Sequence, residues 1–250
     1  MFGFSNKITA GILFSMISFF FTIFVGFYSY RYLWSSLNSE LFGAWLSIFE
    51  FSQFLLLLDL GFTHSFIRRY SKDFMENAFL ELPFLRGSLL FVGLIAIVII
   101  FIVSYISGVI KLVGVLPVAC LSGAVLMTLL GYADTALLRL QERFGVIYAV
   151  NIFSNFIYIL ILLLFPMGFA IYAISVAVVV RSFLLYFFQN FLLGFGFKVK
   201  LNKHEKGNLD VIYLNMAYFL LFMFDAIIMV FLAVPPLLLA VIIIFKYREI

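Results

Sequence analysis

Cysteine, histidine and charged side chains are all scarce in this 250-residue chain. It contains one cysteine and two histidines, and only 11% of its residues are charged. A lone Cys120 cannot form an internal disulfide, and His64 and His204 lie too far apart in the sequence to show the spacing of metal ligands. The sequence therefore predicts no disulfide framework, no bound metal and no cofactor.

Features that would indicate catalysis are equally scarce. No Gly-Lys nucleotide-binding motif is present, so ATP is not an energy source within this chain. A membrane enzyme that transfers or polymerises sugars needs a sizeable extramembrane loop or clustered carboxylates, and the sequence has neither. We therefore expect that the protein is not an enzyme and that neither histidine is catalytic. We also expect no nucleic-acid partner. The net charge of +4 would suggest anionic partners in a soluble protein, but here its distribution along the chain matters more than its size.

Apolar residues are what the chain has in abundance. They make up 66% of it, and phenylalanine alone occurs 35 times. Soluble domains carry about 25% charged residues, and a helix that crosses a bilayer needs about 20 predominantly apolar residues. The composition therefore predicts an all-α integral membrane protein with several spanning helices.

Seven apolar runs are long enough to cross a bilayer, and an eighth begins at residue 237. The seven predicted spans are 8–30, 41–72, 87–110, 112–133, 144–165, 168–197 and 211–234. The polar segment that ends at Arg86 is expected to be an amphipathic connection, and 134–143 a short charged turn. We therefore expect a first bundle of six helices (1–197), a basic cytoplasmic loop (198–210) and the start of a second bundle (211–250).

The basic residues predict the orientation, since cytoplasmic loops carry an excess of lysine and arginine. With a cytoplasmic N-terminus, two basic residues fall outside, Arg31 and Lys111. Eleven fall inside, namely Lys7, Arg68, Arg69, Lys72, Arg86, Arg139, Arg143, Lys198, Lys200, Lys203 and Lys206. This bias predicts a multi-pass protein of the cytoplasmic membrane with its N-terminus inside.

The second span carries two carboxylates, Glu50 and Asp59, and a charge at the centre of a spanning helix costs about 2.5–3.5 kcal/mol. On an ideal helix, residues nine positions apart point to opposite sides, so the two acids do not pair. Each lies in a polar stripe, one made of Ser47, Glu50 and Gln53 and the other of Ser52, Asp59 and Thr63. One of them, with Asp59 the better candidate, caps or locks a neighbouring helix, or the acids serve as pathway or relay groups.

Further polar groups lie in the later spans. Arg181 either extends towards the headgroups or faces a cavity, and Asp225 is a better cavity candidate because it shares a face with Tyr218. The fifth span carries a stripe of Tyr148, Asn151, Asn155 and Tyr158, which we expect to form interhelical hydrogen bonds. Scattered intramembrane charges without a catalytic loop favour a transporter over an enzyme.

Two stretches of the chain resemble a known family. RYLWSSLNSELFGAWLSIFEFSQFLLLLDLGFTHSFIRRYS, residues 31–71, resembles the start of the polysaccharide flippases, the O-antigen and lipid-linked oligosaccharide translocases of the multidrug/oligosaccharidyl-lipid/polysaccharide superfamily. Residues 137–156 resemble that family's connection between its fourth and fifth helices. The matching positions are Arg31 to Leu33, Phe42, Gly43, Trp45, Leu58 to Gly61, Arg68 and Arg69.

This resemblance implies a function and a set of site residues. Members of the family have twelve or fourteen helices in two bundles around a cavity, so this chain would be a shortened product or would dimerise. The implied activity moves undecaprenyl-diphosphate-linked oligosaccharide to the outer leaflet, beside other membrane proteins of polysaccharide assembly. Arg31 and Arg181 would balance the diphosphate, and Glu50, Asp59 or Asp225 would bind a coupling ion. The alternatives are a drug or small-ion antiporter and a membrane-embedded glycosyltransferase or polymerase.

Overall fold

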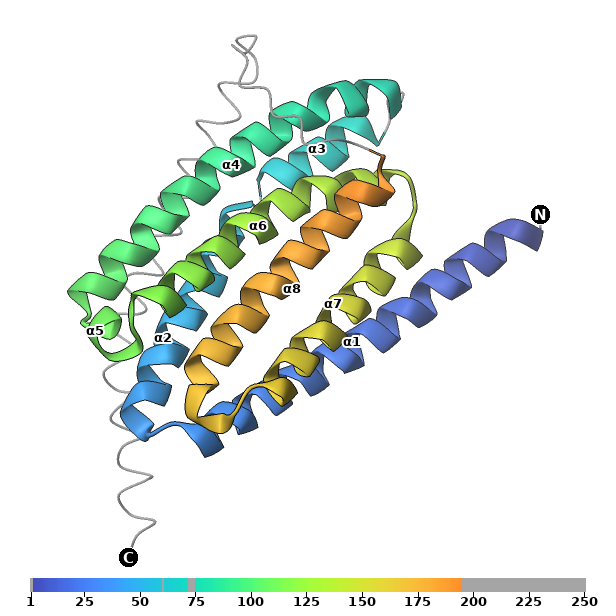
Figure 1. Cartoon of the computed structure of the whole chain (residues 1–250). Helices are drawn as coiled ribbons and strands as arrows, with labels where there is room; N and C mark the ends of the chain where they lie inside the picture. The colour runs from blue at the N-terminus through green and yellow to red at the C-terminus, as the bar shows by residue number, and fades with distance from the viewer. Residues whose placement is uncertain (1, 60, 72–74, 195–250) are drawn as a thin grey trace, which may run out of the picture. The chain divides into compact units, whose positions relative to one another are not determined.

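A computed structural model describes residues 2–59, 61–71 and 75–194 of the protein, and these residues form helices and short connections (Figure 1). The elements are α1 Phe2–Ser36, α2 Ser39–Leu55, η1 Leu56–Asp59, α3 Phe62–Tyr70, α4 Met75–Ile106, α5 Val109–Val113, α6 Val115–Leu140, α7 Phe144–Leu164, η2 Met167–Phe169 and α8 Ala170–Leu192. The chain divides into two units, 1–201 and 202–250. The second unit lies outside the described residues, and so do the predicted seventh span, the start of an eighth and Asp225.

Within the described part, six helical segments are long and apolar enough to cross a membrane. They are Gly11–Ser36, Ser39–Tyr70, Asn77–Ile106, Val115–Leu140, Phe144–Leu164 and Met167–Leu192. The described residues contain no strand. The prediction of an all-α, multi-pass membrane protein is confirmed.

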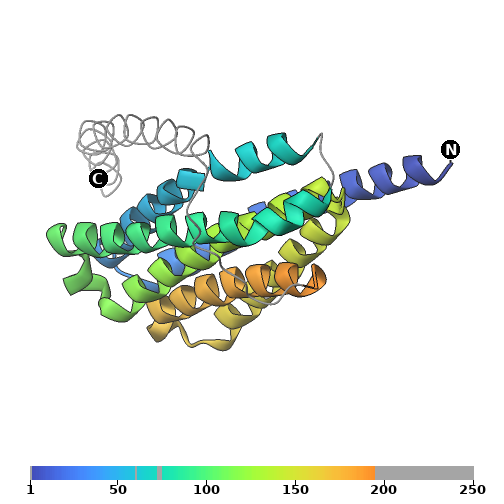
Figure 2. The same ribbon diagram turned by 90° about the horizontal axis from the view of Figure 1, so that it is seen from above.

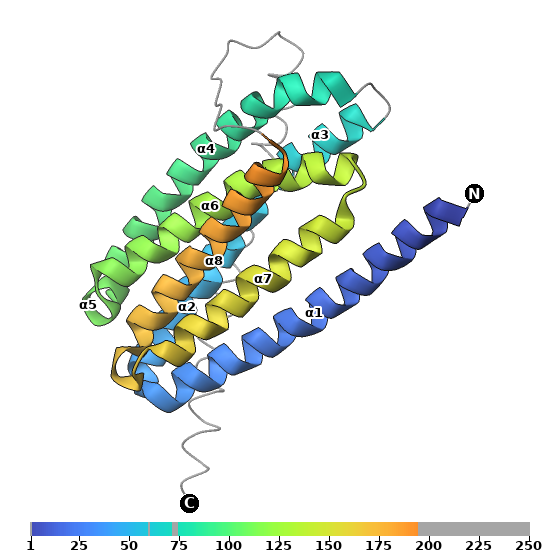
Figure 3. The ribbon, with the colours of Figure 1, turned by 45° about the vertical axis from the view of Figure 1, so that its right-hand side comes forward.

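Helix α6 is central to the packing of this unit. It packs most extensively against α8 and α4, while α7 packs against α8 and α1. Figure 2 shows α2 and α3 on one side of the α4–α6 pair and α8 on the other. Figure 3 shows α7 running beside α1, which is long and packed along only part of its length. Most of the surface of α1 is therefore left to lipid or to another protein surface.

Helix α1 joins α7 through hydrogen bonds between polar side chains. The Asn151 amide donates to Ser18 Oγ at 2.8 Å, and one turn later the Asn155 amide donates to Thr22 Oγ1 at 3.1 Å. Tyr158 continues the same stripe with a hydrogen bond to Ser29. For these three residues of the fifth span, the predicted interhelical hydrogen bonds are confirmed.

The predicted second span is found as one membrane-crossing segment, Ser39–Tyr70, but its α-helix is interrupted by a 3-10 turn. Asn38 caps α2 by accepting the Leu41 N–H at 2.9 Å, and α2 ends at Leu55. The next four residues form the 3-10 turn η1, which advances more per residue than an α-helix, so the ideal-helix angle between the two acids does not apply. The Asp59 side chain accepts a hydrogen bond from the backbone N–H of Thr63. Such a bond replaces the one that this N–H would make to a backbone carbonyl in a continuous helix.

The segment before Arg86 and the residue Asp134 were also placed wrongly. Helix α4 begins at Met75 and passes through Pro83 and Arg86, so no amphipathic connection separates it from the third span. Asp134 lies inside α6, which ends only at Leu140. The polar segment can be helical because one face of it is apolar and buried, formed by Ala78, Leu82, Leu85 and Leu89.

The first helix also extends further than predicted. It continues past Arg31 to Ser36, so Arg31 lies within α1 and does not mark its end. Its last turns are held by ring contacts, since Tyr30 and Trp34 each meet the Phe42 ring edge-on with centroids 5.2 and 5.3 Å away. These contacts fix the corner between α1 and α2.

Candidate functional site

The exposed face of α2 carries a polar stripe inside a membrane-spanning segment. Ser47, Glu50 and Gln53 recur every three residues, and all three are exposed. The second stripe of the same span is buried, since Ser52 is inaccessible and Asp59 and Thr63 nearly so. The two polar stripes that the sequence indicates therefore differ in surroundings. Glu50 faces outward from the described helices, and Asp59 faces their interior.

The carboxylate of Asp59 lies at the break between α2 and α3. It accepts hydrogen bonds from both the hydroxyl and the backbone N–H of Thr63, in the first turn of α3. A carboxylate in this position satisfies an N–H that the start of a helix leaves unpaired, and it complements the helix dipole. The N-cap residue of α3 is Gly61, so Asp59 caps this helix from two positions before it, and of the two roles open from the sequence these hydrogen bonds favour the structural one.

Arg181 lies in the middle of α8 and is half-buried. Its Nε atom is buried without a hydrogen-bond partner, and no carboxylate pairs with it among the described residues. Tyr132 of α6 and Tyr158 of α7 lie within electrostatic range of its guanidinium. Buried polar atoms are normally hydrogen-bonded, so this Nε–H is left available to an acceptor.

Tyr132 connects Arg181 with Asp59. Its side chain lies within electrostatic range of both, as well as of Arg139. With Tyr158 and its hydrogen-bond partner Ser29, these groups form an interior polar band through α1, α7, α8, α6 and η1. We use the name polar band for Ser29, Asp59, Tyr132, Tyr158 and Arg181.

The structure brings together only some of the residues predicted for the site. Asp59 and Arg181 share the polar band. Arg31 and Glu50 are exposed on α1 and α2 and form no ion pair within the described ranges. Asp225 lies outside the residues that the structure describes.

One buried charge pair was missed from the sequence. Arg86 of α4 donates to Asp134 of α6 from Nε at 3.0 Å and from Nη2 at 2.5 Å, and both side chains are fully buried. The signal for it was present: Arg86 follows Leu82 and Leu85 in the apolar helical stripe of α4, and Asp134 falls in the corresponding stripe of α6. A charge in such a stripe requires a buried partner.

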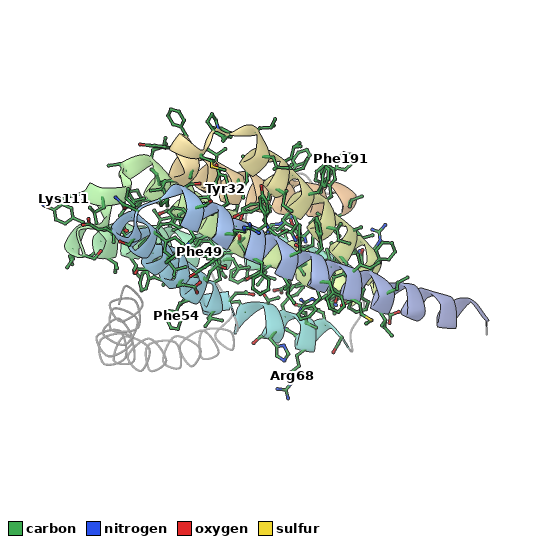
Figure 4. All side chains as sticks on the ribbon, turned by 90° about the horizontal axis from the view of Figure 1, so that it is seen from below. Tyr32, Phe49, Phe54, Arg68, Lys111 and Phe191 are labelled. Carbon is green, nitrogen blue, oxygen red and sulfur yellow. The ribbon has the colours of Figure 1, made fainter. Side chains whose placement is uncertain are left out.

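The described part of the chain holds no cluster of side chains suited to a metal ion. None of its side chains forms a group of three or more His, Cys, Asp or Glu that could hold a metal ion. Figure 4 shows all described side chains on the ribbon, with Arg68 and Lys111 among those labelled. The groups available for binding are the Arg181 guanidinium with its unused donor, the phenol groups of Tyr132 and Tyr158 near it, and the exposed carboxylate of Glu50.

Comparison of the chain with protein-family models, with curated proteins and with solved structures finds no match. The function is therefore argued from the geometry of the polar groups and from the sequence features above.

Proposed function

We propose that this protein translocates an undecaprenyl-diphosphate-linked oligosaccharide across the bacterial cytoplasmic membrane. The observation that carries this proposal is Arg181, a half-buried intramembrane cation whose Nε has no hydrogen-bond partner. The resemblance of residues 31–71 and 137–156 to polysaccharide flippases supports it. In this proposal the N-terminus lies in the cytoplasm, and other membrane proteins of polysaccharide assembly supply and use the substrate.

Arg181 is suited to a diphosphate because of the shape and charge of its guanidinium. Arginine presents donors in a planar fork that matches two phosphate oxygens, and such charge-assisted hydrogen bonds are about twice as strong as neutral ones. Tyr132 and Tyr158 lie within electrostatic range of the group, and in this proposal the Tyr132 hydroxyl offers a further hydrogen bond. An arriving diphosphate would therefore satisfy a buried donor that otherwise lacks a partner.

The exposed stripe of α2 supports a water-filled path for the sugars. Polar side chains in a spanning helix face a cavity or another protein surface, because their exposure to hydrocarbon is costly. Ser47, Glu50 and Gln53 are exposed on the described unit, so this face of α2 is better suited to a cavity than to lipid. Alternating exposure of such a cavity would move the head group while the lipid tail stays in the bilayer.

The coupling group in this proposal is Glu50. Its carboxylate is exposed and forms no ion pair within the described residues, whereas that of Asp59 is engaged by Thr63. The same exposed acid favours the alternative function, a drug or small-ion antiporter. In an antiporter of that kind Glu50 would be essential, as in the flippase, but Arg181 would be dispensable, so substitution of Arg181 distinguishes the two functions.

The test is complementation of a flippase-deficient bacterium, scored by surface polysaccharide, with membrane insertion measured in parallel. We expect restored polysaccharide with the native chain and loss with Arg181→Gln. Arg181→Lys should restore only part of it, because lysine keeps the charge without the fork. Lys111→Gln removes one exposed charge elsewhere and is the matched control. Full activity of an inserted Arg181→Gln protein would contradict the proposal.

A further inference from the structure

The two ends of the helical unit carry different exposed side chains. At one end lie four exposed arginines: Arg68 and Arg69 in the last turn of α3, Arg139 in the last turn of α6, and Arg143 in the connection from α6 to α7. The ends of α3 and α6 are held together by a hydrophobic core, in which Phe66 and Tyr70 meet Ala136 and Leu137. We call these four residues the basic end.

The opposite end is aromatic. Its exposed side chains include Tyr30 and Trp34 near the end of α1, Tyr105 near the end of α4 and Tyr172 near the start of α8. Tyrosine and tryptophan are enriched where helices cross the membrane interface. The exposed cations there are Arg31 and Lys111. The two ends therefore offer a membrane surface different chemistry.

The second span is longer than the hydrocarbon core is thick. Ser39–Tyr70 covers 32 residues. At 1.5 Å per residue it measures roughly 48 Å, against about 30 Å for the hydrocarbon core. The excess of about 18 Å exceeds the length of α3, whose exposed face carries His64, Arg68 and Arg69 and whose other face packs in the core. An excess of that length at the α3 end, where the exposed cations lie, would bring this helix to the depth of the phosphate groups.

The four arginines of the basic end outnumber by one the acids that the structure describes beside them. Arg68 points away from the helices in Figure 4 and has no ion-pair partner among the described residues. Arg143 is held in place by donation from Nη1 to the carbonyl of Leu192 at 3.3 Å. Beside the four arginines, the described acids at this end are three: Glu76 and the half-buried Glu81 in the first turns of α4, and the exposed Glu142. A net positive surface at headgroup depth is complementary to anionic lipid.

We propose that the basic end is a binding surface for the headgroups of anionic phospholipids, with Arg68 and Arg69 of α3 as its principal contacts. It holds α3 against the bilayer surface beyond the break at η1. The aromatic end has no such preference. The occupant is a lipid of the surrounding membrane, so the surface operates independently of any transported substrate.

The experiment uses the purified full chain in detergent, titrated with short-chain phosphatidylglycerol or phosphatidylcholine and followed by native mass spectrometry. A basic residue near an anionic membrane surface contributes about 1 kcal/mol, so affinity for phosphatidylglycerol should fall roughly fivefold per arginine removed, or about 25-fold in Arg68→Gln/Arg69→Gln. Arg31→Gln/Lys111→Gln removes the same charge from the aromatic end and should bind phosphatidylglycerol like the native chain. Phosphatidylcholine should bind all three alike.

Three results would overturn the proposal. One is equal loss of phosphatidylglycerol binding in both double variants, which would indicate a net-charge effect. Another is unchanged binding by Arg68→Gln/Arg69→Gln. The third is competition by millimolar inorganic phosphate, which would indicate an anion site in place of a lipid surface. Thermal unfolding in phosphatidylcholine should be the same for the native chain and both variants, which separates lost binding from lost folding.

Discussion

Arg86 and Asp134 form a buried ion pair between α4 and α6, in which two guanidinium nitrogens donate to the same carboxylate oxygen. The distances are 3.0 Å from Nε and 2.5 Å from Nη2, and neither side chain is accessible to solvent. Asn190 of α8 hydrogen-bonds Asp134, and Tyr186 lies within electrostatic range of both charges. The pair therefore joins the three most closely packed helices at one point.

Breaking this pair should destabilise the protein strongly, whereas replacing both members should not. Arg86→Met or Asp134→Leu alone leaves a buried charge without its partner and should lower the free energy of unfolding by about 3–5 kcal/mol. Arg86→Met/Asp134→Leu removes both charges and should recover most of that loss, because apolar side chains of similar size are often tolerated at such positions. Thermal unfolding in detergent measures all three.

The control for this series is Lys111→Gln, which removes an exposed charge and should leave unfolding unchanged. Single variants as stable as the native protein would show that the two charges are not buried together. A double variant no more stable than the single ones would show that Asn190 or Tyr186 depends on the charges, and that the pair cannot be treated in isolation.

Much of the fold could be predicted because bilayer thickness limits the choices. Uncharged runs such as 144–165 match observed helices within a residue or two, since length and hydropathy decide them. The errors occurred at charged residues. Arg86 and Asp134 appeared too polar for a span, because the cost of burying each charge was counted separately. The sequence does not show that these two charges, 48 residues apart, neutralise each other in the folded protein.

The site was less predictable for a related reason. Ser47, Glu50 and Gln53 could be assigned to one face, because spacing within a helix determines the face. The break at η1 was not apparent, since its four residues are three leucines and Asp59, and leucine favours helix. The link from Asp59 through Tyr132 to Arg181 depends on how three helices pack, and periodicity within one helix carries no information on that.

The hydrogen bond between Asn151 and Ser18 should show a measurable but small coupling energy. Interhelical hydrogen bonds in membranes average about 0.6 kcal/mol and reach about 1.7 kcal/mol. A double-mutant cycle of Asn151→Ala and Ser18→Ala, followed by unfolding, should give a value in that range. Ser18→Ala combined with Thr135→Ala, which bonds Gln189 elsewhere, should be additive. Zero coupling in the first cycle would show that α1 and α7 do not meet through these side chains.

Close approach of α4 and α6 at Gly93 should make that glycine intolerant of large residues. A Cβ there would collide with the end of the Leu126 side chain and lie 3.5 Å from its Cα. Gly93→Leu should therefore destabilise by about 1–3 kcal/mol through overpacking. Gly26 on the exposed face of α1 has nothing within 4 Å, so Gly26→Leu should be neutral or stabilising by up to about 1 kcal/mol. Equal effects of the two substitutions on thermal unfolding would argue against this packing.

Substitutions should show that the Asp59 carboxylate contributes to stability and that the Glu50 carboxylate contributes to transport. Because Asp59 caps α3 through Thr63, Asp59→Ala should lower the free energy of unfolding by about 1 kcal/mol, while Asp59→Asn keeps an acceptor and should retain stability and transport. Glu50 is exposed and caps no helix, so Glu50→Gln should leave the free energy of unfolding unchanged. It should abolish transport in the complementation assay, because Glu50 is the proposed coupling group. A stable Asp59→Asn protein without activity would instead place the coupling group at the break between α2 and α3, inside the polar band, and leave Glu50 as part of the cavity wall.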